Sequence, residues 1–411
     1  MRIPAVLMRG GTSRALFFHR EDLPDDPSLR DHFILAAYGS PDPDRRQVDG
    51  VGGATSSTSK VAVISGGDRA RERGVDVLYH FGQVSIDHDL IDRRGNCGNI
   101  SAAVGPFAVD EGLVTATDPV TLVRFLNVNT DKVIVAHVPT QDGRFDPAGD
   151  FFVPGVPRGG AALRLDYEDP SGAVTGRLLP TGNTTDKLDV PGVGTIEVSL
   201  VDAANPCAFV RWEDLGLTGL ESPDRIDGDQ ELLRRVEAVR SHAGVLAGIS
   251  PDPAASTATS PSVPKLVFVG EPRDYERTDG TTQDAAETTL RASMMSMGRL
   301  HRSFAVTGGI CTSVATMVPG TIPHSVARRD GDTVRIGHPA GILPLAAAVQ
   351  RDGEAWQVPS VSAFRTARRL MDGHVIVPDA YLSGTEQDTA PQPGGGTDQQ
   401  DEHVTPTEVH S

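Results

Sequence analysis

Two residue types that can move a proton near neutral pH, lysine and cysteine, are scarce in this chain and recur at matching places. Only four lysines are present, and two of them, Lys60 and Lys265, each open an apolar, strand-like run. Of the three cysteines, Cys97 and Cys311 each follow glycines and precede a run of small, mostly apolar residues. An amine and a thiol that share one pocket can act as an acid–base pair.

The setting of Cys97 fits a reactive thiol and a structural cysteine about equally well. Cys97 lies in Gly95-Asn96-Cys97-Gly98-Asn99, before a segment at 100–109 that suits a buried helix. Free N–H groups at a helix N-terminus stabilise a thiolate and can hold a carboxylate. A buried cysteine in a tight turn is the competing interpretation. Cys311 gains weight only as the repeat partner of Cys97, and core packing explains Cys207 better.

Lys60 follows a run of hydroxyl residues, at 55–59, and begins a strand that is apolar on both faces. Burial there lowers the preference of an amine for its charged form, so the lysine can serve as a base. It can also stay charged and pair with a carboxylate or an enolate. A strand-end lysine that extends its amine to solvent is the competing interpretation. Lys265 ranks second, because Pro264 precedes it and its lead-in has fewer hydroxyls.

Polar loops and helix starts supply candidates for holding an acidic ligand. The loop Arg9-Gly10-Gly11-Thr12-Ser13 matches Asp202-Ala203-Ala204-Asn205-Pro206, and a simple hairpin turn is the alternative for both. His301 precedes the Cys311 segment, although each histidine considered singly suits a structural role better. We expect the substrate-binding set to be Arg9, Thr12, Ser13, Gly98, Asn99, Asn205, Lys265, His301, Gly309, Thr312 and Ser313, with Cys311 as a second acid or base.

The matched residues keep their order along the chain, which indicates two copies of one fold facing each other. Chance similarity between generic strands is the competing explanation, and the paired lysines favour the repeat. We therefore expect an α+β fold of two pseudo-symmetric halves, each with β strands around a central helix, and a cleft between them. The first half spans 1–185 and is completed by the last strand at 365–382, the second spans 186–364, and 383–411 form a disordered acidic tail.

The positions of individual elements follow from hydrophobic periodicity and turn residues. Strands are expected at 60–64, 76–81, 132–138, 195–201 and 374–378. Helices are expected at 100–109, at 231–246, at 285–300 and from Thr312 to just before Pro319, and 250–264 is expected to be a loop.

Composition narrows the classes of partner. The 411 residues carry a formal net charge of −17, which argues against general nucleic-acid binding and means that local donors must hold any anionic substrate. No apolar run approaches the roughly 20 residues of a membrane helix, so no membrane partner is expected. Three sparse cysteines indicate reduced thiols and a cytoplasmic protein. No nucleotide or metal motif is present, so we expect no cofactor and no metal, and a homodimer is compatible with the sequence.

Seven motifs together resemble the PrpF family, in order from Arg9 to about Pro378. The motifs are Arg9-Gly10-Gly11-Thr12-Ser13, Ser57-Thr58-Ser59-Lys60-Val61-Ala62, Gly95-Asn96-Cys97-Gly98-Asn99, Asp202-Ala203-Ala204-Asn205-Pro206, Thr307-Gly308-Gly309-Ile310-Cys311-Thr312, Val318-Pro319-Gly320-Thr321 and His338-Pro339-Ala340-Gly341. The resemblance implies the diaminopimelate-epimerase-like fold and cofactor-free proton transfer, with Lys60 and Cys97 as the catalytic residues. The family pattern has Lys-Gly where Arg14-Ala15 stand here, and a serine where Ala340 stands.

The resulting hypothesis is a 1,3-allylic proton shift on an unsaturated di- or tricarboxylic acid such as methylaconitate, methylitaconate or oxalomesaconate. Lys60 and Cys97 would share the acid and base roles, and helix N-termini would stabilise the dienolate. One alternative is an epimerase or racemase that uses Cys97 and Cys311 as a two-thiol pair. Others are a non-catalytic protein that binds a carboxylic acid and a thiol redox sensor, for which no resolving cysteine lies near Cys97 in the chain.

Overall fold

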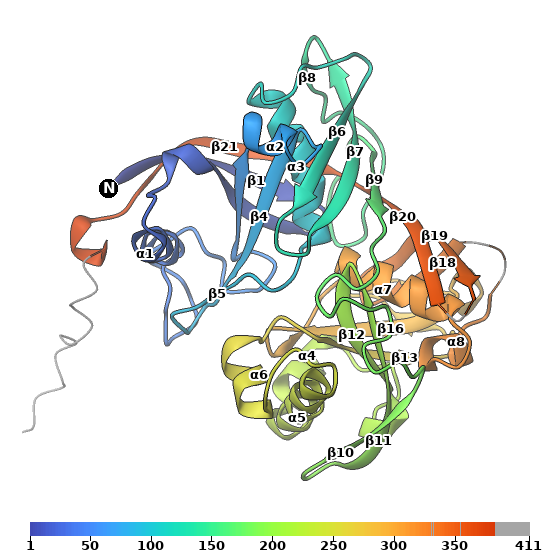
Figure 1. Ribbon diagram of the computed structural model, residues 1–411. Helices are drawn as coiled ribbons and strands as arrows, with labels where there is room; N and C mark the ends of the chain where they lie inside the picture. Colours follow the sequence, from blue (N-terminus) through green and yellow to red (C-terminus); the bar gives the residue numbers. More distant parts are fainter. Residues whose placement is uncertain (330, 332, 354, 383–411) are drawn as a thin grey trace, which may run out of the picture.

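The computed structural model describes residues 1–329, 331, 333–353 and 355–382, and the acidic tail expected at 383–411 lies outside these residues. The chain forms two halves, one above the other in Figure 1, with one buried helix at the centre of each. Among the described residues, no helix has the length and apolar character that crossing a bilayer requires. The α+β fold of two facing halves is confirmed.

The first half contains the strands that surround helix α3. Its strands are β1 (Arg2–Gly10), β2 (Ser13–His19), β3 (Lys60–Ser65), β4 (Val77–Val84), β5 (Ile91–Asp92), β6 (Val120–Asn127), β7 (Lys132–Gln141), β8 (Arg144–Phe145) and β9 (Leu163–Glu168). Its helices are η1 (Arg20–Asp22), α1 (Pro27–Tyr38), α2 (Asp68–Arg71) and α3 (Gly98–Asp110).

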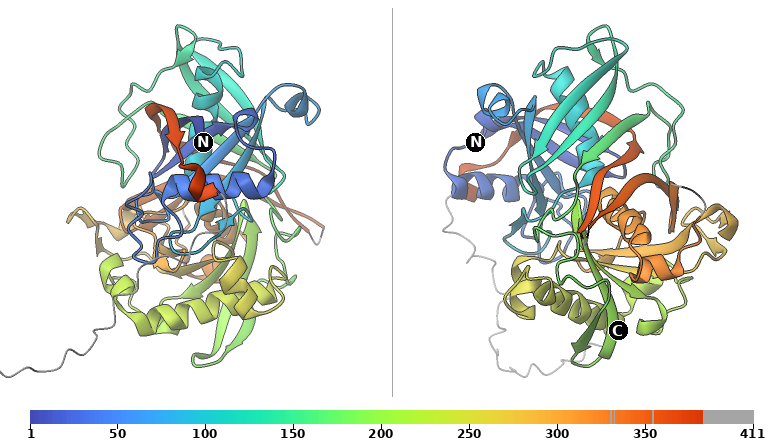
Figure 2. Two further views of the ribbon diagram at one scale, coloured as in Figure 1. Left: turned by 90° about the vertical axis from the view of Figure 1, so that its left-hand side faces the viewer. Right: turned by 45° about the vertical axis from the view of Figure 1, so that its right-hand side comes forward.

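The second half repeats this plan around helix α7 and adds helices on one outer face (Figure 2). Its strands are β10 (Asp186–Val190), β11 (Gly194–Ala203), β12 (Asn205–Arg211), β13 (Lys265–Gly270), β14 (Tyr275–Glu276), β15 (Thr282–Gln283), β16 (Leu290–Ser296), β17 (Arg299–Leu300), β18 (Thr333–His338) and β19 (Gly341–Asp352). Its helices are η2 (Glu213–Leu215), α4 (Pro223–Gly228), α5 (Gln230–Leu246), α6 (Pro253–Thr259), η3 (Ala285–Glu287), α7 (Val306–Met317) and α8 (Ile322–Val326).

Strand pairing shows the internal repeat directly. Hairpin β1–β2 is followed by β3, which runs parallel to β2 with Lys60 opposite Ala15. Hairpin β11–β12 is followed by β13, which runs parallel to β12 with Lys265 opposite Cys207. In the first half, β4 pairs antiparallel with β3, and β6, which follows the central helix, pairs parallel with β4. In the second half, β16 pairs antiparallel with β13, and β18, which follows the central helix, pairs parallel with β16. The predicted match of Lys60 with Lys265 is therefore correct in register.

The last strands tie the two halves together. Strand β20 (Ala355–Arg365) pairs with β19 of the second half and with β9 of the first. Strand β21 (Ala367–Ile376) then lies along β1, as Figure 1 shows, and the short helix η4 (Asp379–Leu382) ends the described chain. The division of the chain near residues 185 and 364 stays a prediction.

Helices α3 and α7 are buried because their sequences are almost entirely small or apolar. Every residue of α3 from Gly98 to Val109 is buried, and so is every residue of α7 from Val306 to Thr316. Both helices belong to one hydrophobic core that spans the two halves. A second core lies beneath the amphipathic helix α5, and a third beneath α1. Such burial fixes the position of both helix N-termini.

Most expected strands and the helices at 100–109 and 231–246 are confirmed, but two segments differ. The expected helix at 285–300 is wrong, because only the single turn η3 forms before β16. Ala292, Met294 and their neighbours favour helix locally, yet β13 and β18 flank them and the sheet prevails. The loop expected at 250–264 contains α6, which starts where Asp252 accepts the N–H of Ala255 at 2.8 Å.

Candidate active site

The N-termini of α3 and α7 meet where the two halves face each other. Cys97 is the N-cap residue of α3, and Ala305 is the N-cap residue of α7. A β-carbon placed on Gly98 would lie 2.6 Å from Cβ of Val306, so only glycine permits this approach. The Thr307 hydroxyl also donates to the Asn96 carbonyl at 3.3 Å. The predicted helix N-terminus at Cys97 is therefore present, and a second one faces it.

The predicted place of Cys311 is wrong. Helix α7 begins at Val306, so Cys311 lies in its middle, fully buried, with its thiol donating to the Val201 carbonyl at 3.1 Å. Burial raises the pKa of this thiol well above its usual value, and Cys207 adds to the effect. Ala305, which has no titratable group, is the structural counterpart of Cys97. A two-thiol pair across the cleft is thus contradicted.

Three predicted binding residues lie on helix α7 beside Cys311 and, like it, do not line the chamber between the two halves. Gly309 packs against Leu343 and leaves no room for a β-carbon, which would lie 2.6 Å from a methyl group. The hydroxyls of Thr312 and Ser313 donate to carbonyls of their own helix, at 2.7 and 2.8 Å. These side chains hold α7 in the core. Helices α3 and α7 are both apolar and have no residue that marks how one aligns with the other. The alignment of Cys97 with Cys311 is therefore wrong by several residues.

A small chamber lies between the halves at the two N-termini. It has a volume of about 20 Å³ and is lined by Ser13, Lys60, Phe81, Gln83, Gly95, Asn96, Cys97, Asn99, Asn205, Ser262, Lys265, Ser296, His301 and Ala305. A wider cavity of about 540 Å³ shares Ser296 and His301 with the chamber and includes Thr12 and Ala340. His301 therefore stands where the wide cavity meets the chamber.

Lys60 enters the chamber from the first residue of β3. Its amine donates to Oε1 of Gln83 and lies 5.7 Å from the centre of the Phe81 ring. Burial lowers the pKa of Lys60 to about 8, an effect that Cys97 opposes and the charge of Lys265 reinforces. An amine with this pKa exists in both protonation states near neutral pH, as an acid–base group requires.

Gln83 fixes the amine of Lys60, and the sequence analysis missed it. The Nε2 group of Gln83 donates to the carbonyls of Ser59 and Ser56, at 2.9 and 3.2 Å. Because both donor hydrogens are used on carbonyls, the amide oxygen must face Lys60. A polar residue inside strand β4 gives no sequence signal of this role, since its function depends on the neighbour opposite it in the sheet, Lys60.

Lys265 reaches the same chamber from the second half. Its amine donates to the Ser262 carbonyl at 3.2 Å. Burial lowers its pKa, while Cys207, Cys97 and Asp92 act in the opposite direction. The two lysines that the sequence paired are thus brought together in space.

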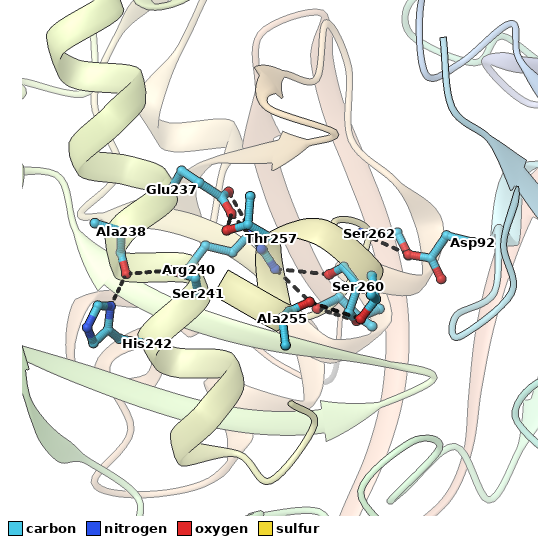
Figure 3. A network of polar contacts seen from close by, with 12 residues as sticks. Asp92, Glu237, Ala238, Arg240, Ser241, His242, Ala255, Thr257, Ser260 and Ser262 are labelled. Atoms are coloured by element: carbon cyan, nitrogen blue, oxygen red, sulfur yellow. Dashed lines mark hydrogen bonds and ion pairs between the residues drawn. The ribbon is translucent and has the colours of Figure 1, made fainter. Parts of the chain in front are cut away.

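A polar network holds the loop that leads into Lys265 at the start of β13 (Figure 3). Arg240 of α5 donates to the carbonyls of Ser260 and Val263, at 3.1 and 3.2 Å, and is ion-paired with Glu237 at 2.6 Å. The Ser262 hydroxyl donates to Asp92 at 2.5 Å, which links the second half to β5 of the first. This link could not be predicted from the sequence, because 170 residues separate its partners.

His301 is a neutral group at the junction of chamber and cavity. Its Nδ1 accepts the backbone N–H of Ser303 at 3.1 Å, so the ring proton lies on Nε2. Burial, together with the charges of Lys60 and Lys265, lowers the pKa of His301 to about 3. A neutral Nε2–H is a donor suited to a carboxylate or an enolate oxygen.

Asn99 and Thr12 form one hydrogen-bonded group at the edge of the chamber. The Asn99 amide donates to the Thr12 hydroxyl at 3.1 Å, and the Ser303 hydroxyl donates to the same oxygen at 3.0 Å. Arg365, which the sequence analysis missed, donates to Oδ1 of Asn99 at 3.2 Å from a fully buried position. The positive charge of Arg365 lies next to Asn99, which lines the chamber, and it adds to the positive field there.

Two buried polar atoms of the chamber have no partner in the described part of the chain. They are the hydroxyl oxygen of Ser13 and the amide oxygen of Asn205. Ser13 is 2% exposed and Asn205 is 1% exposed, so leaving them unpaired costs free energy. Both were predicted to bind substrate, and both line the chamber at the ends of matching hairpins.

Arg9 is a predicted binding residue that lies elsewhere. Its guanidinium donates to the carbonyls of Gly11 and Thr366, at 2.9 and 3.0 Å, and lines a different cavity. Arg9 thus braces the hairpin that carries Ser13 and does not reach the chamber.

The chamber is positively charged although the whole chain is strongly acidic. Lys60 and Lys265 line it, and its described lining contains no aspartate or glutamate. Helix N-termini at Gly98 and Val306 add partial positive charge. This arrangement favours an anion and stabilises negative charge that develops on it.

Comparison with known proteins agrees with the fold. A 3-methylitaconate isomerase of Eubacterium barkeri is 44% identical over 385 residues, 93% of this chain and 99% of that protein. A 2-methyl-aconitate isomerase of Shewanella oneidensis is 40% identical, over 92% of this chain and 97% of that protein. The crystal structure of a methylitaconate-delta-isomerase covers 95% of this chain and 99% of its own, with a TM-score of 0.73 and 43% identity.

A hydroxyproline epimerase of Agrobacterium vitis shares the fold, with a TM-score of 0.57 at 14% identity, and covers 94% of this chain and 96% of its own. Together the fold and the relatives define an isomerase built from two facing halves. The chain belongs to the PrpF family, whose model matches residues 1–378.

Proposed function

We propose that the enzyme shifts a double bond in an unsaturated di- or tricarboxylic acid by moving one proton between carbons of an allylic system. One group removes a proton from carbon, and a second group delivers a proton two carbons away. Between these steps the negative charge lies on a dienolate whose carboxylate oxygen faces the helix N-termini. No electrons are transferred, and the product is an isomer of the substrate.

The observation that carries the proposal is the convergence of Lys60, Lys265 and Cys97 in a chamber whose described lining holds no carboxylate. A pKa of about 8 leaves roughly a tenth of the Lys60 amine neutral at pH 7, enough to act as a base. Lys60 and Cys97 share the acid and base roles. Lys265 and His301 bind carboxylate oxygens, and Ser13 and Asn205 supply the polar atoms that the chain itself leaves unpaired.

The small size of the chamber implies that the substrate approaches it from the adjoining cavity. A chamber of about 20 Å³ holds about one water molecule, whereas the adjoining cavity of about 540 Å³ has room for a small acid. The substrate therefore binds from the cavity, past His301, and its reacting carbons displace the contacts that close the chamber. Closing again would exclude water from the dienolate.

The names of the relatives support methylitaconate, methylaconitate or a related acid as the substrate. Ala340 lines the wide cavity, where the family pattern would place a serine hydroxyl. We therefore expect the wall around Ala340 to distinguish one acid from another. A cytoplasmic location and a homodimer belong to the same proposal. The cytoplasmic location rests on the three unpaired cysteines.

A substrate panel tests the proposal. The purified protein is incubated separately with methylitaconate, methylaconitate and oxalomesaconate, and the isomers formed are followed by proton NMR. We expect isomerisation of at least one acid by the wild type and loss of at least a hundredfold in kcat for Lys60→Ala and Cys97→Ser. Lys187→Gln serves as a control, because Lys187 is exposed on β10 outside the chamber. Binding without isomerisation of any acid would instead indicate a non-catalytic carboxylic-acid-binding protein.

A further inference from the structure

A second cavity of the first half lies apart from the active site and is rich in arginine. It has a volume of about 600 Å³ and shares no lining residue with the chamber or with the cavity in front of it. Its lining consists of Arg9, Asp110, Phe145, Pro147, Ala148, Val156, Pro157, Arg158, Gly159, Arg368, Arg369 and Leu370. The proposed function makes no use of this cavity.

Charge in this arginine cavity is unbalanced. Arg369 is neutralised by Glu111 at 2.7 Å and Asp372 at 3.2 Å. Arg9, Arg158 and Arg368 have no acidic partner among the described residues. Asp110 is the one carboxylate in the described lining, and burial raises its pKa. Three unpaired guanidiniums around one carboxylate leave an excess of positive charge in a chain of net charge −17.

Strand register brings two of these arginines together. Arg9 of β1 and Arg368 of β21 stand directly opposite each other in the antiparallel pair. Like charges at opposed positions destabilise a sheet, so this arginine pair costs free energy. The charge of Arg368 also adds to burial in lowering the pKa of Arg9. An anion placed between the two guanidiniums would remove this repulsion.

Arg9 is already held in place for such a ligand. Its Nη1 donates to the Gly11 carbonyl at 2.9 Å and to the carbonyl and hydroxyl of Thr366, both at 3.0 Å. These bonds fix the side chain and leave its other nitrogens free of described partners. A donor that is fixed before binding loses little conformational entropy when the ligand arrives.

The rest of the cavity is apolar. Phe145, Val156, Pro157 and Leu370 contribute carbon surface beside the guanidiniums. A ligand that fits both parts has an anionic group and an organic body. We propose that this cavity is a binding site for a small organic anion that carries two or more negative charges, distinct from the isomerase site. Phosphate esters and polycarboxylates share that chemistry.

Isothermal titration calorimetry of the whole protein at low salt tests this site. The probes are phenyl phosphate, inorganic pyrophosphate and tricarballylate. We expect at least one probe to bind, and Arg368→Gln to weaken that binding by about tenfold or more, since a charge-assisted hydrogen bond contributes about 1.5–3 kcal/mol. Arg158→Gln should weaken it in the same direction. Arg335→Gln, which removes another exposed strand arginine, should leave it unchanged.

The outcomes separate the ligand classes. Binding that depends on Arg368 for the phosphates alone identifies a phosphate-bearing ligand, and for tricarballylate alone it identifies a polycarboxylate. Probes that enter the Lys60 chamber would bind wild type and Arg368→Gln equally, so only the difference between the two proteins reports on this cavity. The proposal is overturned if no probe binds, or if every probe binds Arg368→Gln as tightly as the wild type. Neither result bears on the isomerase activity.

Discussion

Replacing Lys60 with methionine should stabilise the protein at neutral pH while it abolishes activity. Burial lowers the pKa of Lys60 from 10.5 to about 8. Each pH unit between the native and unfolded pKa corresponds to about 1.36 kcal/mol, so the charged amine destabilises the native state at pH 7 by about 3 kcal/mol. Methionine removes this cost but deprives Gln83 of its donor, at about 1–3 kcal/mol. A net gain of about 1 kcal/mol is expected.

The pH dependence of this gain is its sharper signature. Between pH 8 and 10.5 the unfolded chain binds more protons at Lys60 than the native protein, so wild-type stability rises with pH through this window. The Lys60→Met variant has no amine at this position, so its stability does not rise with pH in this way. Its advantage over the wild type should therefore shrink by about 1 kcal/mol between pH 7 and pH 9, whereas the lost hydrogen bond to Gln83 contributes equally at both.

Urea unfolding at pH 7 and pH 9 measures both effects. Lys187→Met is the matched control, because Lys187 is exposed on β10, and its stability should stay within about 0.5 kcal/mol of the wild type at either pH. The contradicting result is that Lys60→Met is less stable than the wild type, by the same amount at pH 7 and at pH 9. That result would mean that the amine carries no burial cost.

Further predictions concern groups in and near the chamber. The pH profile of kcat/KM should have a midpoint near pH 8, rising if Lys60 is the base and falling if it is the acid, and a flat profile from pH 7 to 9 would contradict its titration. Gln83→Leu removes the acceptor of the charged amine and should move that midpoint to lower pH; an unmoved midpoint would exclude a positioning role. Cys97→Ser should abolish turnover with little loss of stability, whereas Cys311→Ala should keep turnover and cost about 1 kcal/mol in urea unfolding. His301 should stay neutral, so its ring NMR signals should show no titration above pH 5.

Rare residues at the starts of elements made part of the site predictable from sequence. Lys60 and Lys265 are two of four lysines, and each begins a strand, so their pairing could be read without a structure. Cys97 could be placed at a helix N-terminus because glycines flank it and small residues follow. The α+β fold followed from the same repeat.

Residues whose role depends on contacts across the fold were not predictable. Ala305 is the N-cap residue of α7, as Cys97 is of α3, but it carries no reactive group. Because α7 has no residue that marks its register, the sequence pattern points to Cys311 instead. Gln83 acts only because Lys60 lies opposite it in the sheet. The strand at β16 contains residues that favour helix, and only its burial between β13 and β18 decides its conformation.

Deuterium incorporation at carbon is the direct measure of proton transfer by Lys60 and Cys97. The substrate identified in the panel is incubated with the wild type, Lys60→Ala and Cys97→Ser in D₂O, and carbon-bound hydrogen is followed by proton NMR. If Lys60 and Cys97 transfer the proton, the wild type places deuterium at the allylic carbons as the double bond moves, and both variants lose this exchange. Isomerisation by the wild type without solvent deuterium at carbon, or full exchange in both variants, would contradict proton transfer by Lys60 and Cys97.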